Sequence, residues 1–506
     1  MAYDIPQIQV FSNATWILLL SGVVYGFVRL TSRPKWPKTA PKFLKTEDWP
    51  VLGALRFFSD RRNFVLHGTS QAESNNFSFY FGKHQLVGMG GQDARKAFFE
   101  SKELSMSEGY AVFLVGTPDL PTDFENHFNK WFNRSMMALM RRENFVKNLD
   151  RMVADTRAAL ERIEESGEGI MDPFDHVYRA VYQLTMRTVG ANEIADSPAE
   201  LTETLHLFEI IERASSPVRI IFPWLPTPEH LYKMWAGWRL YVKMNKIVDA
   251  RRKEGRVEDD ALQFLLDGEG GGDVVWILSF VIGALYAGQV NTGVNAAWML
   301  VYLAATPEWY KRVQDEVDAA LNKHRVSADQ SPVDILALLT VDDWESEFPM
   351  LDLCSRETIR LQMAGTAIRK NIGGKDVPIG KSGEVIPKDG FAVYLLDDIH
   401  FDPEIYSNPH EFDPGRYLPD RAEDKKVPLA YLGWGAGRHP CLGMKFAKLE
   451  ATIIGVLFTA MYDYSLQDVQ GQAMPKPPPM DRDRHSSKKP DTPMRLKFER
   501  RGHASA

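Results

Sequence analysis

The chain has 506 residues, of which 44% are hydrophobic, 11% aromatic and 25% charged. This composition is typical of a globular protein with a large core and excludes disordered, collagen-like and disulfide-rich chains. The formal net charge of −7 gives no reason to expect nucleic acid as a partner. Only two cysteines occur, Cys354 and Cys441, which indicates a reducing compartment for most of the chain.

The N-terminal segment predicts a membrane anchor. No charged residue occurs between Asp4 and Arg29, and residues 14–28 are almost entirely apolar. Residues 9–28 supply the roughly 20 residues that a helix needs to cross a bilayer. The basic residues that follow place the C-terminal side in the cytoplasm; they are Arg29, Arg33, Lys35 and Lys38. A cleaved signal peptide is the alternative, but prolines follow the segment instead of a small-residue cleavage pattern.

With this orientation, the chain is predicted to consist of three parts. Residues 1–30 form a single-pass anchor, residues 31–45 a proline-rich hinge, and residues 46–506 one large cytosolic domain. A cytosolic domain also predicts that the glycosylation motifs at Asn76 and Asn133 carry no sugar.

After the hinge, the patterning predicts a mainly helical fold with small β-sheets. Two strands are expected within residues 77–89, with a turn at Gly82. Helical periodicity then covers residues 93–100, 123–148, 150–165, 172–190, 199–214, 229–254 and 259–267. The apolar loop at residues 222–226 is either a packed corner or a surface that dips into a membrane or guards an apolar entrance.

The longest predicted helix covers residues 274–306, which contain no charged residue. A second membrane span is possible by length, but Gln289, Asn291 and Asn295 would be costly against lipid. We therefore expect a helix through the core of a domain, with its polar cluster facing an internal site. Helices at 307–323 and 347–363, strands and turns over 373–391, a loop at 475–493 and a final strand complete the chain.

The segment around Cys441 combines four glycines and a proline, and a helical pattern begins after Gly443. Cys441 therefore lies just before a helix N-terminus, where free N–H groups and the helix dipole favour a thiolate that can bind a metal ion. Glycines let a backbone approach a flat cofactor closely. Arg438 and His439 supply positive partners for carboxylates at its rim.

These residues resemble the haem-binding loop of the cytochrome P450 family of haem-thiolate monooxygenases, of fungal microsomal type. The family pattern is Phe-Gly-x-Gly-x-Arg-x-Cys-x-Gly, and the chain matches it at Gly435, Gly437, Cys441 and Gly443. The chain departs from the pattern at Trp434, where Phe is usual, and at His439, where Arg is usual. The resemblance implies a haem b with Cys441 as its axial thiolate ligand. The other residues that it implies near the haem are Trp434, Arg438, His439 and Arg369.

Two upstream motifs extend the resemblance over residues 35–500. Glu357 and Arg360 match the Glu-x-x-Arg helix of the family, and Arg416 matches the arginine that completes a Glu-Arg-Arg network. Residues three apart share one helix face, so Glu357 and Arg360 can form a buried pair that Arg416 neutralises. The resemblance implies the cytochrome P450 fold, and Cys354 is expected to be a core residue.

The long helix departs from the family at its centre. The family pattern is Ala/Gly-Gly-x-Asp/Glu-Thr-Thr, and here Gly288 is present, Val290 replaces the acid and Asn291 replaces the first threonine. The sequence from Gln289 onward resembles the branch containing the steroid 7α- and 12α-hydroxylases and prostacyclin synthase. The resemblance implies that Asn291 and Thr292 hold water for proton delivery beside Gly288.

Three functions are compatible with this pattern. The favoured one is hydroxylation of a hydrophobic polycyclic substrate, a steroid or terpenoid, with O2 and electrons from NADPH through a reductase. An alternative is a reductase-independent isomerase that acts on a peroxide-type substrate. A third is a non-catalytic haem or lipid binder.

The resemblance also implies location and partners. The endoplasmic reticulum membrane is the expected site, with NADPH–cytochrome P450 reductase and, as a further donor, cytochrome b5 as partners. A cationic docking face is expected at Arg141, Arg142, Lys445 and Lys448. The expected pocket walls are residues 110–114, 222–225, 284–291, 365–368 and 475–480.

Overall fold

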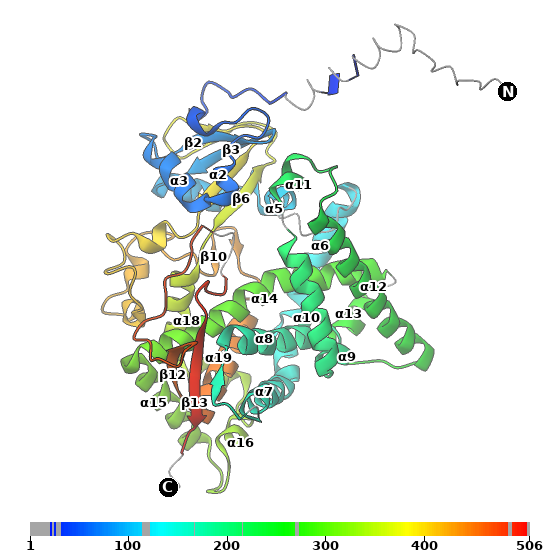
Figure 1. Cartoon of the computed structure of the whole chain (residues 1–506), viewed down its shortest axis with the longest axis vertical. Coiled ribbons are helices and arrows are strands. Elements are labelled where there is room, and N and C mark those ends of the chain that lie inside the picture. Colours follow the sequence, from blue (N-terminus) through cyan, green and yellow to red (C-terminus); the bar gives the residue numbers. More distant parts are fainter. Residues whose placement is uncertain are drawn as a thin grey trace, which may run out of the picture. The chain divides into compact units, whose positions relative to one another are not determined.

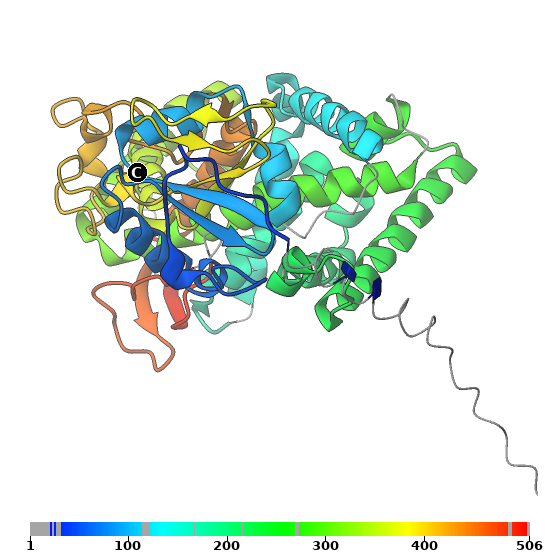
Figure 2. The ribbon, with the colours of Figure 1, turned by 90° about the horizontal axis from the view of Figure 1, so that it is seen from above.

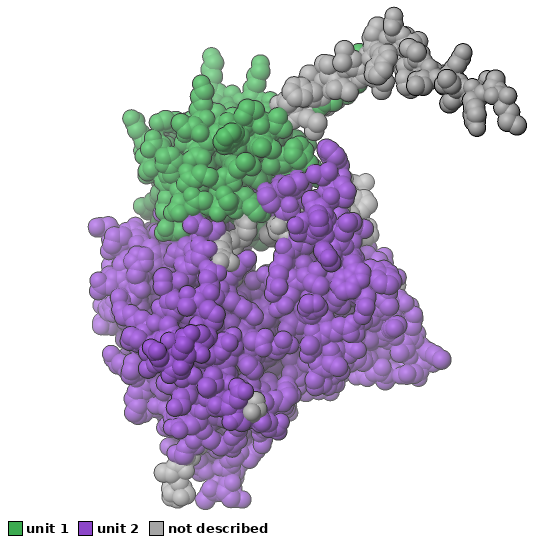
Figure 3. Space-filling model, in the orientation of Figure 1, with its two compact units in different colours: residues 1–110, 220–223, 368–394 green, residues 111–219, 224–367, 395–506 purple. Residues whose placement is uncertain are grey.

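The computed structural model divides into two compact units, which Figure 3 colours separately. Unit 1 comprises residues 1–110, 220–223 and 368–394, and unit 2 comprises residues 111–219, 224–367 and 395–506. The described residues are 21–22, 25–26, 32–113, 122–165, 167–214, 216–268, 273–483 and 488–502. The predicted anchor, apart from four residues, and Leu114 lie outside them.

Unit 1 is built around a six-stranded sheet with the order β1-β2-β3-β9-β6-β4 (Figures 1 and 2). Its strands are β1 (Lys42–Phe43), β2 (Phe77–Phe81), β3 (His84–Met89), β4 (Leu104–Ser105), β6 (Thr366–Asn371) and β9 (Phe391–Leu395). Strands β2 and β3 form the predicted antiparallel hairpin, which turns at Gly82 with φ +59°. Strand β1 pairs with β2, so the end of the proline-rich segment joins the sheet.

Short helices accompany this sheet, and only α4 among them was predicted from the sequence. Unit 1 contains η1 (Lys45–Glu47), α2 (Arg56–Ser59), α3 (Arg61–Ser70), α4 (Gln92–Glu100) and most of α5 (Met106–Phe113), with the small hairpin β7 (Val377–Pro378) and β8 (Val385–Ile386). Phe57 of α2 packs against Phe79 in a tilted arrangement and Phe64 of α3 packs edge-on, with ring centroids 5.0 and 4.9 Å away. Burial of these rings holds α2 and α3 in place, which the short helical periods alone did not reveal.

Unit 2 contains the long helices and several short ones. They are α6 (Thr122–Leu139), α7 (Arg142–Glu165), α8 (Pro173–Val189), α9 (Asn192–Ala195), α10 (Pro198–Arg213), α11 (Pro217–Ile221, shared with unit 1), α12 (Pro228–Glu254), α13 (Ala261–Asp267), α14 (Val274–Ala305), α15 (Pro307–His324), α16 (Pro332–Leu336), α17 (Val341–Ser346), α18 (Pro349–Gln362) and α19 (Met444–Met461). Several begin at a side-chain cap followed by proline, as at Asp172, Ser197 and Thr227.

Helix α14 is the core helix of unit 2. Asp273 caps its first turn by accepting a hydrogen bond from Val275 N, and the helix packs against α8, α18 and α19. Among the described residues it is the one helix long and apolar enough to cross a membrane, yet 61% of its most apolar stretch is buried inside the protein. The structure therefore supports the expected core helix over a second membrane span.

One helix prediction was wrong. The helix expected over residues 123–148 is two helices, α6 and α7, which separate at Met140 and Arg141. The Nδ2 atom of Asn144 donates to the carbonyls of Ala138 and Leu139, over 2.9 and 3.1 Å, and so caps the end of α6. A side-chain hydrogen bond that caps a helix end does not appear in the hydrophobic period, so the sequence pattern did not predict this break.

Small sheets and turns complete unit 2. Strands β12 (Tyr462–Asp468), β13 (Met494–Arg500) and β5 (Ile170–Met171) form a three-stranded sheet, in which β13 is the predicted final strand. Strands β10 (Gly435–Ala436) and β11 (His439–Pro440) form a hairpin. Three short helices precede this hairpin, η2 (Ile399–Phe401), η3 (Pro414–Tyr417) and η4 (Glu423–Lys425).

Candidate functional site

The loop that carries Cys441 is a tight hairpin. Gly435 pairs with Pro440 across β10 and β11, and the Cys441 N–H donates to the carbonyl of Trp434 over 2.8 Å. Gly435 has φ +72°, and a Cβ atom there would lie 2.4 Å from the carbonyl oxygen of His439. Gly437 also has a positive φ, of +59°. The backbone therefore requires glycine at both positions.

Cys441 lies at the expected place, three residues before Met444, the first residue of α19. Its side chain is accessible, whereas Cys354 is buried in the core as expected. The protein packed around the thiol raises the pKa of Cys441, and the hydrogen bond from Gly443 N acts in the opposite direction. Binding to a metal cation would favour the thiolate over the thiol.

Helix α14 has one accessible stretch in its middle. Ala287 and Asn291 are exposed and Gly288 is half-buried, although most of the residues around them are buried. The Asn291 Nδ2 atom donates to the carbonyl of Ala287 over 3.1 Å. Thr292 is only 8% exposed. The structure thus brings Gly288 and Asn291 to one accessible face, whereas Thr292 packs into the helix bundle.

Glu357, Arg360 and Arg416 form one buried network. Arg360 donates to both carboxylate oxygens of Glu357, over 2.9 and 2.7 Å, and the Nε atom of Arg416 donates to Oε1 over 3.0 Å. All three residues are fully buried. Two guanidinium groups therefore balance one carboxylate, and the excess positive charge needs a further acid.

Glu423 is that further acid, and the sequence reasoning missed it. Its Oε2 atom accepts from Nη1 of Arg416 over 2.7 Å. Burial alone would raise its pKa, but hydrogen bonds from Ser407, Arg421 and Arg416 lower the pKa of Glu423 to about 2. Tyr417 completes the network by donating to Oε2 of Glu357 over 2.9 Å. Arg416 and Glu423 lie seven residues apart, a spacing that would place both on one face of an α-helix. No α-helix connects them, so this spacing did not predict their contact.

In unit 1, Arg369 has a missed neighbour, Arg95. The Arg369 guanidinium lies 4.7 Å from the ring centroid of Phe98 and donates to the Phe98 carbonyl over 2.5 Å. Arg95, on α4, is 4% exposed, and its Nη1 atom lies 3.5 Å from the Tyr394 hydroxyl. Its Nε atom has no hydrogen-bond partner in the described part of the chain. Two buried cations beside one aromatic cluster fit an anionic group.

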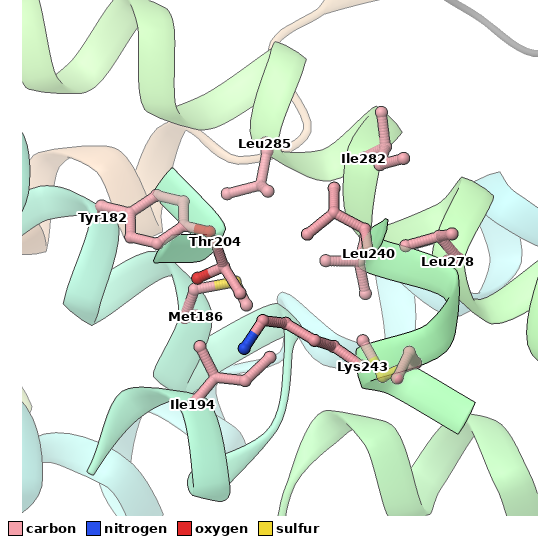
Figure 4. A pocket seen from close by; sticks show the side chains of 11 residues that line it. Tyr182, Met186, Ile194, Thr204, Leu240, Lys243, Leu278, Ile282 and Leu285 are labelled. Carbon is pink, nitrogen blue, oxygen red and sulfur yellow. The ribbon is translucent and has the colours of Figure 1, made fainter. Parts of the chain in front are cut away.

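A separate apolar pocket lies between α8, α10, α12 and α14 (Figure 4). Leu278, Ile282 and Leu285 line it from α14. They lie on a different face of the helix from Asn291. The ammonium group of Lys243 at its edge is bound by Glu200 and Glu203. This pocket is therefore distinct from the accessible stretch of α14.

The expected cationic face is partly neutralised. Arg142 is paired with Asp342 and Glu345, and Lys448 is paired with Asp352 over 2.7 Å. Arg141 and Lys445 form no ion pair with any residue that the structure describes. The positive charge that remains available on this surface is therefore smaller than the sequence indicated.

Comparison with known proteins identifies the family. Residues 44–494 match the family model described as Cytochrome P450. The chain is a cytochrome P450. It is 33% identical to the cytochrome P450 monooxygenase AacuE of Aspergillus aculeatus, over 91% of this chain and 92% of that protein. It is 26% identical to a sterol 14-demethylase of Arabidopsis thaliana, over 86% of this chain and 88% of that protein.

A solved structure agrees on the fold of this P450. The retinoic acid-bound cyanobacterial CYP120A1 has a TM-score of 0.69 and 18% sequence identity, and the match covers 92% of this chain and 100% of that chain. The predicted P450 fold is thereby confirmed. Because the similar proteins include several named monooxygenases, the chain is an oxygenase, and the non-catalytic binder is disfavoured.

The family implies a haem whose iron is held by a cysteine thiolate. The residues present fit such a group. Cys441 is accessible on a glycine hairpin, and α14 offers an accessible stretch within the same compact unit. At Gly288 the nearest atom to an added Cβ is a methyl carbon of Thr185 at 3.9 Å. The backbone of α14 at Gly288 is therefore not covered closely by any other side chain that the structure describes.

Proposed function

We propose that this P450 holds haem b through the thiolate of Cys441 and hydroxylates a hydrophobic polycyclic substrate, a steroid or terpenoid. Electrons come from NADPH through NADPH–cytochrome P450 reductase, and the bound haem supplies the activation of O2. The observation that carries the proposal is the accessible Cys441 thiol at the start of α19, in the same unit as the accessible stretch of α14.

The residues of the haem loop have separate tasks in this proposal. Gly435, Gly437 and Gly443 let the backbone lie close to the porphyrin, and Trp434 packs beside Cys441. The side chains that bind the haem carboxylates are cationic or donate hydrogen bonds; they are Arg438, His439 and Arg369. The network of Glu357, Arg360 and Arg416 supports the loop, which its complete burial favours.

On α14, Asn291 binds the water that delivers protons, and Gly288 leaves room for the reacting oxygen. Thr292 supports this turn from the buried side. The test is Asn291→Leu, which should retain haem but divert electrons from product to released peroxide. Coupled turnover equal to that of the natural protein would contradict the role of Asn291.

A second candidate function is a reductase-independent isomerase of a peroxide-type substrate. The observation that favours it is Val290, an apolar residue at the place of the family's usual acid, 7% exposed in the structure. Turnover assays with and without NADPH, reductase and O2 separate the two functions. Product formed from a peroxide without all three would favour the isomerase.

A binding screen over steroids and terpenoids tests the substrate class. A substrate that displaces the water ligand of the haem iron shifts the absorption spectrum, and product analysis of such compounds gives the oxidised carbon. The similarity to a sterol 14-demethylase supports starting with sterols. Conversion of neither steroids nor terpenoids would reject this substrate class.

We propose that the enzyme resides in the endoplasmic reticulum membrane and docks its reductase at the surface near Cys441, with cytochrome b5 as a further donor. Lys445 and Arg141 provide the cationic contacts, because Arg142 and Lys448 are already paired with acids. Salt screens contacts between exposed charges. The rate of haem reduction should therefore fall as salt rises, and a constant rate would contradict this docking surface.

A further inference from the structure

A second asparagine, Asn295, lies on the accessible side of α14. Ala287, Asn291 and Asn295 follow one another at intervals of four residues, which places them along one face of the helix. Ala287 and Asn291 are exposed and Asn295 is half-buried, whereas Thr292 and the two residues after it are buried. The accessible stretch of the helix is therefore lined by two amide side chains one turn apart.

Hydrogen bonds fix the orientation of both amides. The Asn291 Nδ2 atom donates to the carbonyl of Ala287 over 3.1 Å, and the Asn295 Nδ2 atom donates to the carbonyl of Asn291 over 2.8 Å. Because a carbonyl oxygen can only accept, the NH2 end of each amide must face the helix backbone. The Oδ1 atom of each asparagine is thereby left as an acceptor for a group outside the helix.

The Oδ1 atom of Asn295 is buried and has no hydrogen-bond partner among the residues described. Leaving a buried acceptor unsatisfied costs about 1–3 kcal/mol, so such atoms normally bind an ordered donor. Water is a suitable donor, because it can bond to Oδ1 and still make further bonds to the next water.

We propose that Asn291 and Asn295 act as a pair that holds a file of ordered water along α14, and that this file delivers protons to the site beside Gly288. The inference rests on the proposed monooxygenase function and adds Asn295 to it. Each water passes on one proton and receives one from the next water, with bulk solvent as the source, so neither amide gains or loses a proton. Asn295 is a positioning residue, because it acts through the water.

The pair explains how the enzyme works without the acid and first threonine that are usual in its family. Val290 cannot hold a proton, and Thr292 is buried away from the accessible face. Two oriented amide oxygens one turn apart can hold water at both positions without carrying charge. Their bonds to carbonyls four residues earlier also limit rotation of the side chains.

The test compares Asn295→Leu and Asn295→Thr in the full-length holoenzyme with reductase. Leucine keeps the size and removes the acceptor, whereas the threonine hydroxyl can donate to the Asn291 carbonyl and accept from water. The readouts are product formed and peroxide released per NADPH, with a steroid or terpenoid that the natural protein converts, and the solvent deuterium isotope effect. Asn245→Leu on α12 is the control, since Asn245 also makes a side-chain bond within its helix, to Asp249.

Asn295→Leu should lower product per NADPH about tenfold or more and change the isotope effect, because positioned proton transfer contributes at least this much. Asn295→Thr should restore part of the coupling, and Asn245→Leu should leave it unchanged. Haem content, the spectrum of the reduced carbon monoxide complex and turnover driven by hydrogen peroxide should be retained in all variants.

Two results would overturn the proposal. One is natural coupling and an unchanged isotope effect in Asn295→Leu, which would leave no role for the Oδ1 atom. The other is an equal loss of haem content and peroxide-driven turnover, which would show that the residue only stabilises the helix. If the natural protein itself forms product with neither NADPH nor O2, the monooxygenase proposal fails first, and the proposed file of ordered water fails with it.

Discussion

The Nε2 atom of His400 accepts a hydrogen bond from the backbone N–H of Leu432 over 2.9 Å. The carbonyl of His400 accepts another from Nη1 of Arg360 over 2.6 Å. Leu432 lies two residues before Trp434, and Arg360 belongs to the buried network around Glu357. His400 therefore joins that network to the loop that carries Cys441.

His400→Leu should weaken the hold on the Cys441 loop. The substitution leaves the Leu432 N–H without an acceptor inside the protein, which costs about 1–3 kcal/mol. We expect a lower thermal unfolding temperature and a smaller fraction of thiolate-ligated haem in the reduced carbon monoxide spectrum. His400→Gln, which keeps an acceptor, is the control, and equal behaviour of the two variants would contradict the role of the hydrogen bond.

The same residue predicts a pH dependence. Burial, aided by the charge of Arg360, lowers the pKa of His400 from 6.5 to about 3. Between these values the unfolded chain binds a proton that the folded protein does not, so His400 makes stability fall as the pH drops below about 6.5. Chemical unfolding between pH 7 and 4 should show a shallower decline for His400→Gln than for the natural protein. Parallel curves would contradict this assignment.

Glu357→Gln should be strongly destabilising. Arg360 and Arg416 would lose the carboxylate between them while both guanidinium groups stay fully buried. Removing one partner of a buried ion pair costs about 3–5 kcal/mol. Denaturant unfolding should show this loss, together with a lower haem content after expression.

The matched control for Glu357→Gln is Glu308→Gln, which removes an exposed carboxylate from its pair with Arg312. Exposed pairs of this kind contribute at most about 1 kcal/mol. A loss at Glu357 no larger than at Glu308 would show that the buried network does not stabilise the fold.

Glu316→Gln should stabilise the protein at alkaline pH. Glu316, on α15, accepts from the first N–H groups of α18, Met350 at 2.6 Å and Leu351 at 3.1 Å. Burial raises the pKa of Glu316 to about 7 in spite of these bonds. A raised carboxyl pKa stabilises at low pH and loses that contribution as the pH rises from about 4.5 through 7. The unfolding temperature of Glu316→Gln should exceed that of the natural protein at pH 8 and match it at pH 4, whereas the same difference at both pH values would contradict the assignment.

An exposed aromatic face on α12 should contact the membrane. Leu231, Trp235 and Trp238 follow the helical period and are 58, 45 and 60% exposed, and Trp224 in the preceding loop is 68% exposed. That loop is therefore not a packed corner. Tryptophan with leucine on an exposed helix face is typical of the membrane interface.

A fluorophore on Trp238→Cys in the full-length protein tests this face. Nitroxide-labelled lipids in vesicles should quench it more strongly than a fluorophore on Val326→Cys, a site that is 80% exposed on another part of unit 2. Equal quenching at the two sites would argue against membrane contact. If instead the fluorophore at position 238 is shielded from solvent without lipid, and this shielding increases with protein concentration, the face contacts a second copy of the chain.

Periodic patterns predicted much of the fold. Helix α14 was expected over 274–306 and occupies Val274–Ala305, because an uncharged run bounded by charged residues leaves few alternatives. The hairpin of β2 and β3 and the final strand β13 were also expected. Helices α2 and α3 were missed, because Phe57 and Phe64 gain their stability from contacts with the sheet and not from the local sequence.

By itself, the sequence determined the chemistry of the Cys441 loop, the order of the three motifs and the apolar central helix, since each depends on residue type and short-range spacing. Only the tertiary structure decided which polar groups face one another. It placed Asn291 and Asn295 along the accessible side of α14 and Thr292 on the buried side, and it brought His400 to Leu432 and Glu423 to Arg416. The last two contacts join segments outside the long helices whose separation in the chain carries no period, so folding alone sets them.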